Sequence, residues 1–233
     1  MKVVILCGGK GTRLSELTEE LPKPMIEIGG KPILWHLMKL YAHYGHSDFI
    51  LCTGYKGKEI MKYFSKINEG WNVEFSDSGE ATNKAQRIKA IENKINEDQF
   101  LVSYGDDLTD VDINRVIDFH KKKGKMATLV SVPLVSPFGI IRTNENDEVC
   151  DFEEKPVLKD RMNGGFYVFS RRIFSHLKGR KDLEKDVLKE LAGKREVAAF
   201  QHDGFWKSIN TLKDVIEFNE LVKDGTMPWK VWP

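Results

Sequence analysis

The fold of this chain is decided by the stretch VVILCGGKGTR, which occupies residues 3–13. The uninterrupted β-branched and leucine run from Val3 to Leu6 is typical of a buried parallel strand. Residues 7–11 follow as Cys-Gly-Gly-Lys-Gly, a glycine-rich turn. Because parallel strands are covered on both faces, we expect helices on both sides of the sheet.

Strand and helix patterns then alternate along the chain, as βαβ units require. From residue 138 to 169, short strands and turns replace this alternation, which indicates a β-rich insertion. The sequence therefore predicts an α/β fold with a mixed, mostly parallel central sheet, flanking helices and a β-rich insertion, in one domain over residues 1–233. Strands are expected at 3–6, 49–53, 72–76, 100–104, 127–133 and 197–201, and helices from 33 to about 44 and at 58–66, 85–95, 113–123, 171–177, 183–192 and 212–223.

Composition excludes several classes of protein. A hydrophobic fraction of 41% is ample for a core, and 36 Lys+Arg nearly cancel 35 Asp+Glu. With a net charge of +1 there is no general positive field for nucleic acid or an anionic membrane, so any anionic ligand must be met locally. Three widely spaced cysteines, no signal-peptide core and no apolar run of ~20 residues lead us to expect a cytoplasmic protein without disulfides.

The glycine-rich turn is the first candidate site. Glycines let backbone N–H groups approach a phosphate chain, and Arg13 and Lys23 can add positive charge. The turn lacks both the P-loop ending and the G-x-G-x-x-G spacing, which disfavours a P-loop NTPase and an NAD(P) oxidoreductase. A tight turn with two surface cations is the alternative. Since ligands bind at the carboxyl ends of parallel strands, residues 7–13 and 105–107 should converge.

The string GGKGTRL at 8–14, with PKPM at 22–25, resembles the sugar-phosphate nucleotidyltransferase family. Residues 26–39, 54–57, 71–73, 104–106, 163–166 and 228–232 extend the resemblance over nearly the whole chain and are most similar to the cytidylyltransferases. The resemblance implies a Rossmann-like nucleotidyltransferase domain that forms homo-oligomers. It also implies transfer of a nucleotidyl group from a nucleoside triphosphate, CTP, to a sugar 1-phosphate, α-D-glucose 1-phosphate, with Mg²⁺ as cofactor.

The resemblance also assigns roles to individual residues. Arg13 and Lys23 would be catalytic, on the departing pyrophosphate and near the α-phosphate, and Asp106 would ligate Mg²⁺. The implied nucleotide-binding residues are Leu6, Cys7, Gly8, Gly9, Lys10, Gly11, Thr12, Arg13, Lys23, Thr82, Arg87 and Gly105. The implied sugar-phosphate-binding residues are Gly139, Glu154, Lys155 and Asn163. Alternatively, Asp106 and Asp107 are a strand-end turn or helix cap, and Lys155 is a surface lysine.

Two departures from the family bear on these assignments. Asn210 stands where the cytidylyltransferases carry a metal-binding aspartate, so it keeps an oxygen donor but loses a charge. Lys207 adds a cation nearby. The connection between Phe64 and Trp71 is also shorter, and residues 82–87 differ from the family's glycine-rich stretch.

These departures leave alternatives open. The chain could use another nucleoside triphosphate or another sugar or alditol phosphate. It could also be a non-catalytic relative that binds nucleotide-sugars, an alternative that the loss of the aspartate at Asn210 motivates.

Overall fold

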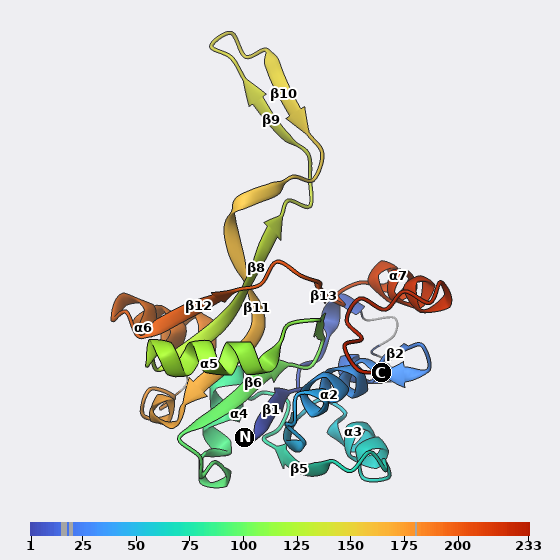
Figure 1. Ribbon diagram of the computed structural model, residues 1–233, viewed down its shortest axis with the longest axis vertical. Helices are drawn as coiled ribbons and strands as arrows, with labels where there is room; N and C mark the ends of the chain where they lie inside the picture. Colours follow the sequence, from blue (N-terminus) through green and yellow to red (C-terminus); the bar gives the residue numbers. More distant parts are fainter. Residues whose placement is uncertain (15–17, 19–20, 180) are drawn as a thin grey trace.

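Seven strands form the central sheet of the computed structural model, in the order β12-β8-β11-β6-β1-β4-β5 (Figure 1). The structure describes residues 1–14, 18, 21–179 and 181–233, and Arg13 without its side chain. Within the sheet, β11 runs antiparallel to both neighbours and the other adjacent pairs are parallel. The mixed, mostly parallel sheet predicted from the sequence is therefore confirmed. Its strands are β1 (Val3–Leu6), β4 (Asp48–Thr53), β5 (Asn72–Asp77), β6 (Gln99–Tyr104), β8 (Ala127–Val135), β11 (Val157–Ser170) and β12 (Val197–Gln201).

Both faces of the sheet are covered, as the apolar run of β1 predicts. Val3 and Ile5 enter one core cluster, whereas Val4 and Leu6 enter the other. The first cluster is completed by α2 (Ile33–His43), α3 (Gly57–Phe64), α5 (Ile113–Lys123) and α7 (Leu212–Lys223). The second is completed by α4 (Lys84–Ala90) and by the segment that ends in α6 (Lys189–Gly193).

Three predicted helices differ from the observed ones. The helix expected at 85–95 ends at Ala90 and continues as a 3-10 turn, Glu92–Lys94, which lies between the buried Ile91 and Ile95. The helix expected at 171–177 is a 3-10 helix, Arg171–Ser175. The one expected at 183–192 begins as a π-helix, Leu183–Leu188, before α6. Apolar periodicity predicts that a helix forms but does not distinguish these hydrogen-bond patterns.

The β-rich insertion is a projecting arm. Strands β8 and β11 extend beyond the sheet and continue into the hairpin of β9 (Ile140–Thr143) and β10 (Val149–Glu153), which stands away from the rest of the molecule (Figure 1). Several large apolar side chains of the arm are more than half exposed: Phe138, Ile141, Val149, Phe152 and Val157.

Two short ribbons were not predicted. One pairs β2 (Glu27–Ile28) with β3 (Lys31–Pro32), and the other pairs β7 (Asp107–Thr109) with β13 (Trp206–Ser208). The second ribbon brings segments one hundred residues apart to the carboxyl end of β6. The three cysteines are free, as predicted. Among the described residues, no helix has the length and apolarity that a membrane span needs.

Candidate active site

A cavity of about 600 Å³ lies at the carboxyl ends of β1 and β6. The predicted convergence is confirmed there, because the Gly105 N–H donates to the Leu6 carbonyl at 3.1 Å. Most of the residues predicted to bind the nucleotide line this cavity: Leu6, Cys7, Gly8, Gly9, Gly11, Thr12, Lys23, Thr82, Arg87 and Gly105.

Two predicted nucleotide-binding residues are not seen in the cavity wall. The Lys10 ammonium is exposed and lies 3.4 Å from the Glu80 carboxylate. The side chain of Arg13 is outside the described part of the structure, although its backbone belongs to the 3-10 turn Thr12–Leu14.

Two carbonyls of the glycine-rich loop already accept hydrogen bonds, whereas its N–H groups from Gly8 onward are free in the described part of the chain. The Gly8 carbonyl accepts from the Tyr55 N–H at 3.1 Å, and the Gly11 carbonyl accepts from the Leu14 N–H at 2.9 Å. Within the described residues, the N–H groups of Gly8 to Gly11 have no acceptor. Gly11 has a φ of +62°, which a residue with a Cβ adopts only with strain. A loop with free N–H groups, in which two carbonyls already accept hydrogen bonds, suits an anionic ligand such as phosphate.

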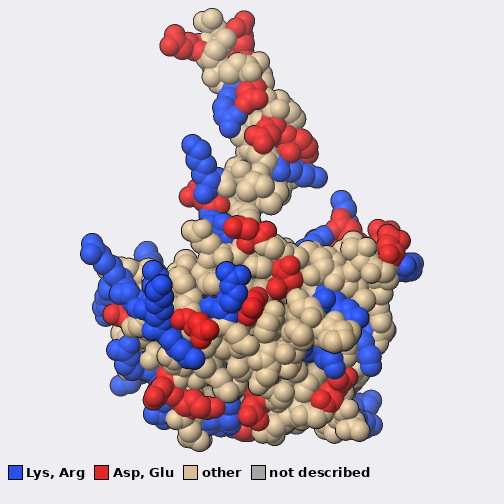
Figure 2. All heavy atoms as spheres, viewed as in Figure 1, with Lys and Arg blue, Asp and Glu red and all other residues tan. Residues whose placement is uncertain are grey.

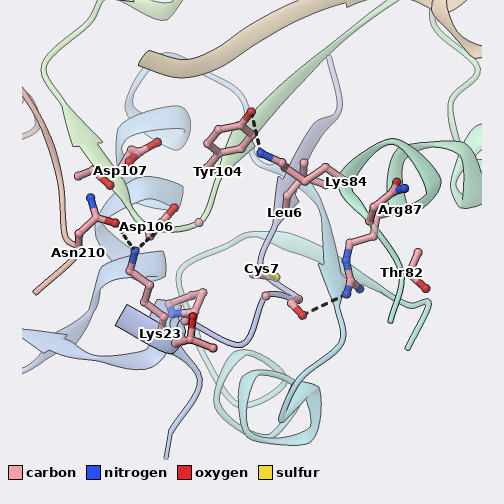
Figure 3. Close-up of a pocket in the computed structure, with 18 of the residues that line it drawn as sticks. Leu6, Cys7, Lys23, Thr82, Lys84, Arg87, Tyr104, Asp106, Asp107 and Asn210 are labelled. Atoms are coloured by element: carbon pink, nitrogen blue, oxygen red, sulfur yellow. Dashed lines mark hydrogen bonds and ion pairs between the residues drawn. The ribbon is translucent and has the colours of Figure 1, made fainter. Parts of the chain in front are cut away.

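The Lys23 ammonium joins two oxygen-bearing side chains at one side of the cavity (Figure 3). It donates to the Asp106 carboxylate and to Asn210 Oδ1, the latter at 3.0 Å. Lys23 is only 8% exposed, on the 3-10 turn Lys23–Met25. Asp106 follows β6, and the Ile209 N–H donates to its carbonyl at 3.0 Å, which fixes the Asn210 segment beside it. The predicted catalytic lysine and the predicted metal ligands therefore form one cluster.

The same two side chains have the chemistry of a Mg²⁺ site. Asp106 and Asn210 offer only oxygen atoms, and both already hold a cation in the form of the Lys23 ammonium. Among the described residues there is no group of three or more His, Cys, Asp or Glu side chains that could hold a metal ion. A magnesium ion here would take its remaining ligands from phosphate and water, which is common for Mg²⁺ in nucleotide sites. The residues therefore fit the implied cofactor.

Asp107 differs from its neighbour Asp106. It is the first residue of β7 and is buried, and a Cβ on Gly165 would lie 2.4 Å from its Oδ2. Burial, and then the charge of Asp106, raises the pKa of Asp107 to about 8. Asp107 also lines the cavity, so its strand-end alternative stays a prediction.

Hydrogen-bonded side chains form another side of the cavity. Of these side chains, only Asn163 was predicted from the sequence. Asn163 lines the cavity and donates to the Tyr167 hydroxyl, which lies 2.7 Å from the Tyr104 hydroxyl. The Lys84 ammonium lies 4.4 Å from the centroid of the Tyr104 ring and donates to the Tyr104 hydroxyl (Figure 3). It also forms an ion pair with Glu184. Burial raises the pKa of Tyr104 and Tyr167, so both remain neutral donors.

The remaining predicted sugar-phosphate residues lie outside this cavity, at the base of the arm. A Cβ on Gly139 would lie 2.9 Å from Glu154 Oε2, so these two are neighbours. Lys155 is exposed, in the turn between β10 and β11. Lys207 also lies outside the cavity wall and pairs with Glu217 of α7.

Several lining residues were missed by the sequence analysis: Glu80, Asn83, Lys84, Tyr104, Asp182, Trp206 and Ser208. Tyr104 and Trp206 had a usable signal, because Tyr104 belongs to the matched stretch 104–106 and Trp206 directly precedes Lys207. No sequence signal indicated Asp182, because it is the N-cap of the π-helix and reaches the cavity only through the tertiary fold.

Comparison with known proteins gives a consistent result. Residues 2–225 match the family described as "Nucleotidyl transferase". The chain is 40% identical over 257 residues to glucose-1-phosphate cytidylyltransferase of Salmonella typhimurium, with 100% of both chains covered. It is 30% identical to mannose-1-phosphate guanyltransferase of Hypocrea jecorina, over 97% of this chain and 66% of that one. The solved structure of HddC from Yersinia pseudotuberculosis superposes with a TM-score of 0.78 at 27% identity, covering 95% of this chain and 99% of that one.

Proposed function

Because this chain belongs to the nucleotidyl transferase family, we propose that it transfers a cytidylyl group from CTP to α-D-glucose 1-phosphate, giving CDP-glucose and pyrophosphate. The observation that carries the proposal is the Lys23 cluster beside the glycine-rich loop. A buried ammonium, a carboxylate and an amide oxygen lie next to unpaired N–H groups, which is the arrangement that a triphosphate and its metal require. The similarity to a cytidylyltransferase supports the choice of base and sugar.

The reaction needs no protein nucleophile in this proposal. The phosphate of the acceptor is already ionised at neutral pH and attacks the α-phosphorus in line, with pyrophosphate leaving on the opposite side. The N–H groups of Gly8 to Gly11 bind the triphosphate, and Lys23 neutralises the α-phosphate as the second anion approaches. Arg13 is proposed to neutralise the departing pyrophosphate.

Asp106 and Asn210 would hold the Mg²⁺ ion, with fewer charges than two carboxylates provide. The ion, when bound, supplies charge neutralisation to the triphosphate. Lys23 would then release these two oxygens and turn its ammonium to the phosphate. The same lysine would thus keep the empty site electrically balanced and serve the bound nucleotide.

The acceptor is proposed to lie against the wall that contains Asn163. Its polar groups suit a polyhydroxylated sugar, because buried hydroxyl and amide groups recognise hydroxyls by hydrogen bonding. Gly139, Glu154 and Lys155 remain proposed ligands of the sugar phosphate. Since they lie outside the cavity, their contact requires the base of the arm to move toward it.

A direct test is to identify the product. The protein is incubated with CTP, Mg²⁺ and glucose 1-phosphate, and phosphorus NMR follows the conversion. We expect the paired resonances of a sugar nucleotide together with free pyrophosphate. If hexose and alditol phosphates are all unreactive while CTP still binds saturably, the chain is a nucleotide-binding relative without catalysis. The missing carboxylate at Asn210 is the observation that favours this second candidate.

The arm supports a further part of the proposal, that the protein is a homo-oligomer. Residues 138–157 carry six acidic and two basic side chains, whereas residues 171–195 carry nine basic and four acidic ones. Figure 2 shows acidic side chains along the arm and a dense group of basic ones beside α6. A second copy can therefore offer the arm both opposite charge and cover for its exposed apolar side chains.

A further inference from the structure

The guanidinium of Arg87 lies beneath the glycine-rich loop and bonds to the segments that follow three parallel strands. From α4, Nη2 donates to the Gly8 carbonyl at 3.1 Å (Figure 3). It also donates to the Gly79 carbonyl at 2.8 Å. Nη1 donates to the Thr53 carbonyl and to the Ser78 hydroxyl, the latter at 3.1 Å. One side chain thus connects the carboxyl ends of β1, β4 and β5.

Two glycines leave the space that this guanidinium fills. A Cβ on Gly8 would lie 2.4 Å from Arg87 Cζ. A Cβ on Gly54 would lie 2.6 Å from Arg87 Nη2 and 2.8 Å from the Gly8 carbonyl oxygen. Both distances are too short for real atoms, so alanine at either position displaces the guanidinium, the loop or both. Gly54 is outside the cavity wall, so it tests this contact without touching a bound nucleotide.

Both terminal nitrogens of Arg87 donate to the protein. The residue is only 3% exposed, and burial lowers its pKa. Among the described residues it has no carboxylate partner, and its charge is satisfied by three carbonyls and a hydroxyl. A buried charge that gives up such bonds to follow a ligand would incur a large desolvation cost. The side chain is therefore fixed in place before any nucleotide arrives.

We propose that Arg87 is a positioning residue and not a phosphate ligand: it holds the Gly8 carbonyl away from the ligand so that the N–H groups of the loop face the triphosphate. This inference rests on the proposed function, which makes the loop the triphosphate site. Lysine cannot replace arginine here, because an ammonium has no planar fork to reach all the acceptors at once.

The test compares Gly54→Ala with Gly193→Ala, a glycine in α6 that has no atom near its Cβ position and no positive φ. Binding of CTP with Mg²⁺ is measured by calorimetry well below the unfolding temperature, and circular dichroism shows that each variant is folded. We expect Gly54→Ala to weaken CTP binding at least about 10-fold, roughly 1.4 kcal/mol at 25 °C, and Gly193→Ala to bind like the wild type. Arg87→Lys should lose binding as Gly54→Ala does, despite keeping its charge. A folded Gly54→Ala variant with wild-type affinity would overturn the inference, as would wild-type affinity in Arg87→Lys.

A second readout does not depend on any ligand. The Tyr55 N–H donates to the Gly8 carbonyl, so its hydrogen exchange reports on the position of the loop. We expect faster exchange at Tyr55 in Gly54→Ala and Arg87→Lys than in Gly193→Ala. If the wild type binds no nucleoside triphosphate, the proposed function fails while the exchange data still decide whether Arg87 positions the loop. Unchanged exchange in both variants refutes that role.

Discussion

The Lys23 ammonium donates to Asn210 Oδ1 at 3.0 Å, across 187 residues of sequence. The same nitrogen donates to the Asp106 carboxylate, so one buried cation connects the 3-10 turn Lys23–Met25 with the end of β6 and with the connection between β13 and α7. The contact depends on the β7–β13 ribbon, in which Asp107 pairs with Ser208. The proposed reaction centre is therefore assembled by tertiary structure from two distant motifs.

Replacing Lys23 with methionine should reduce turnover by at least about 100-fold, because the α-phosphate loses its neutralising charge. Pyrophosphate release at saturating substrates measures this effect. Lys39→Met is the matched control, since Lys39 is also part-buried and pairs with a carboxylate, Glu69, away from the cavity. Wild-type turnover in folded Lys23→Met would remove the lysine from the mechanism.

Replacing Asn210 with aspartate should lower the Mg²⁺ concentration needed for half-maximal rate several-fold, because a second carboxylate joins Asp106. A magnesium titration of the initial rate measures the change. Asn146→Asp, on the exposed arm, adds the same charge away from the cavity and should leave the titration unchanged. Equal half-saturation in wild type and Asn210→Asp would show that this position does not contact the metal.

His120 predicts a loss of stability in mild acid. Burial first, and then the charge of Arg172, lowers the pKa of His120 to about 4, and its Nδ1 lies 2.8 Å from the Thr128 hydroxyl. The unfolded chain binds the proton near pH ~6.5 and the folded chain does not, so the stabilisation is complete above that pH and is lost as pH falls toward ~4. Between about pH 7 and about pH 5, the free energy of unfolding should fall by about 2 kcal/mol from this residue alone.

Urea unfolding at both pH values checks this expectation in the wild type and in His120→Gln. The variant should lose much of the pH dependence, because glutamine does not titrate. His43, which is not buried, provides the comparison variant His43→Gln, and its pH dependence should match the wild type. An equally steep fall in His120→Gln would assign the acid sensitivity to other groups.

The arm predicts a charge-dependent assembly. Glu145, Asp147 and Glu148 changed together to lysine should reduce the molar mass measured by light scattering, because the arm would then repel the basic segment of a second copy. Lys181, Lys185 and Lys189 changed to glutamate should do the same, and the combined variant should recover the assembly. A monomeric wild type, or no recovery in the combined variant, would contradict the pairing of these surfaces.

Much of the fold was predictable because its signals are local. The apolar run of β1 identifies a parallel strand that is covered on both faces, and the structure confirms it. The β7–β13 ribbon could not be predicted, since strands of three residues have no usable periodicity. The pair of Lys84 with Glu184 joins residues one hundred positions apart, and nothing in either local sequence indicates it.

The role of Arg87 could not be predicted from the local sequence either. A resemblance identifies which residue occupies a motif, but whether its guanidinium faces a ligand or the backbone depends on the space left by Gly8 and Gly54. Those glycines belong to different strand-to-helix connections. Only their contact in three dimensions shows that both terminal nitrogens of Arg87 are already bonded to the protein.

The most direct test of the proposed reaction is the initial rate of pyrophosphate release with Mg²⁺ and glucose 1-phosphate, compared across CTP, UTP, dTTP, GTP and ATP. We predict release with CTP at a rate well above that with the other four, and loss of that release in Lys23→Met. No release with CTP, or faster release with another triphosphate, would contradict the proposed reaction.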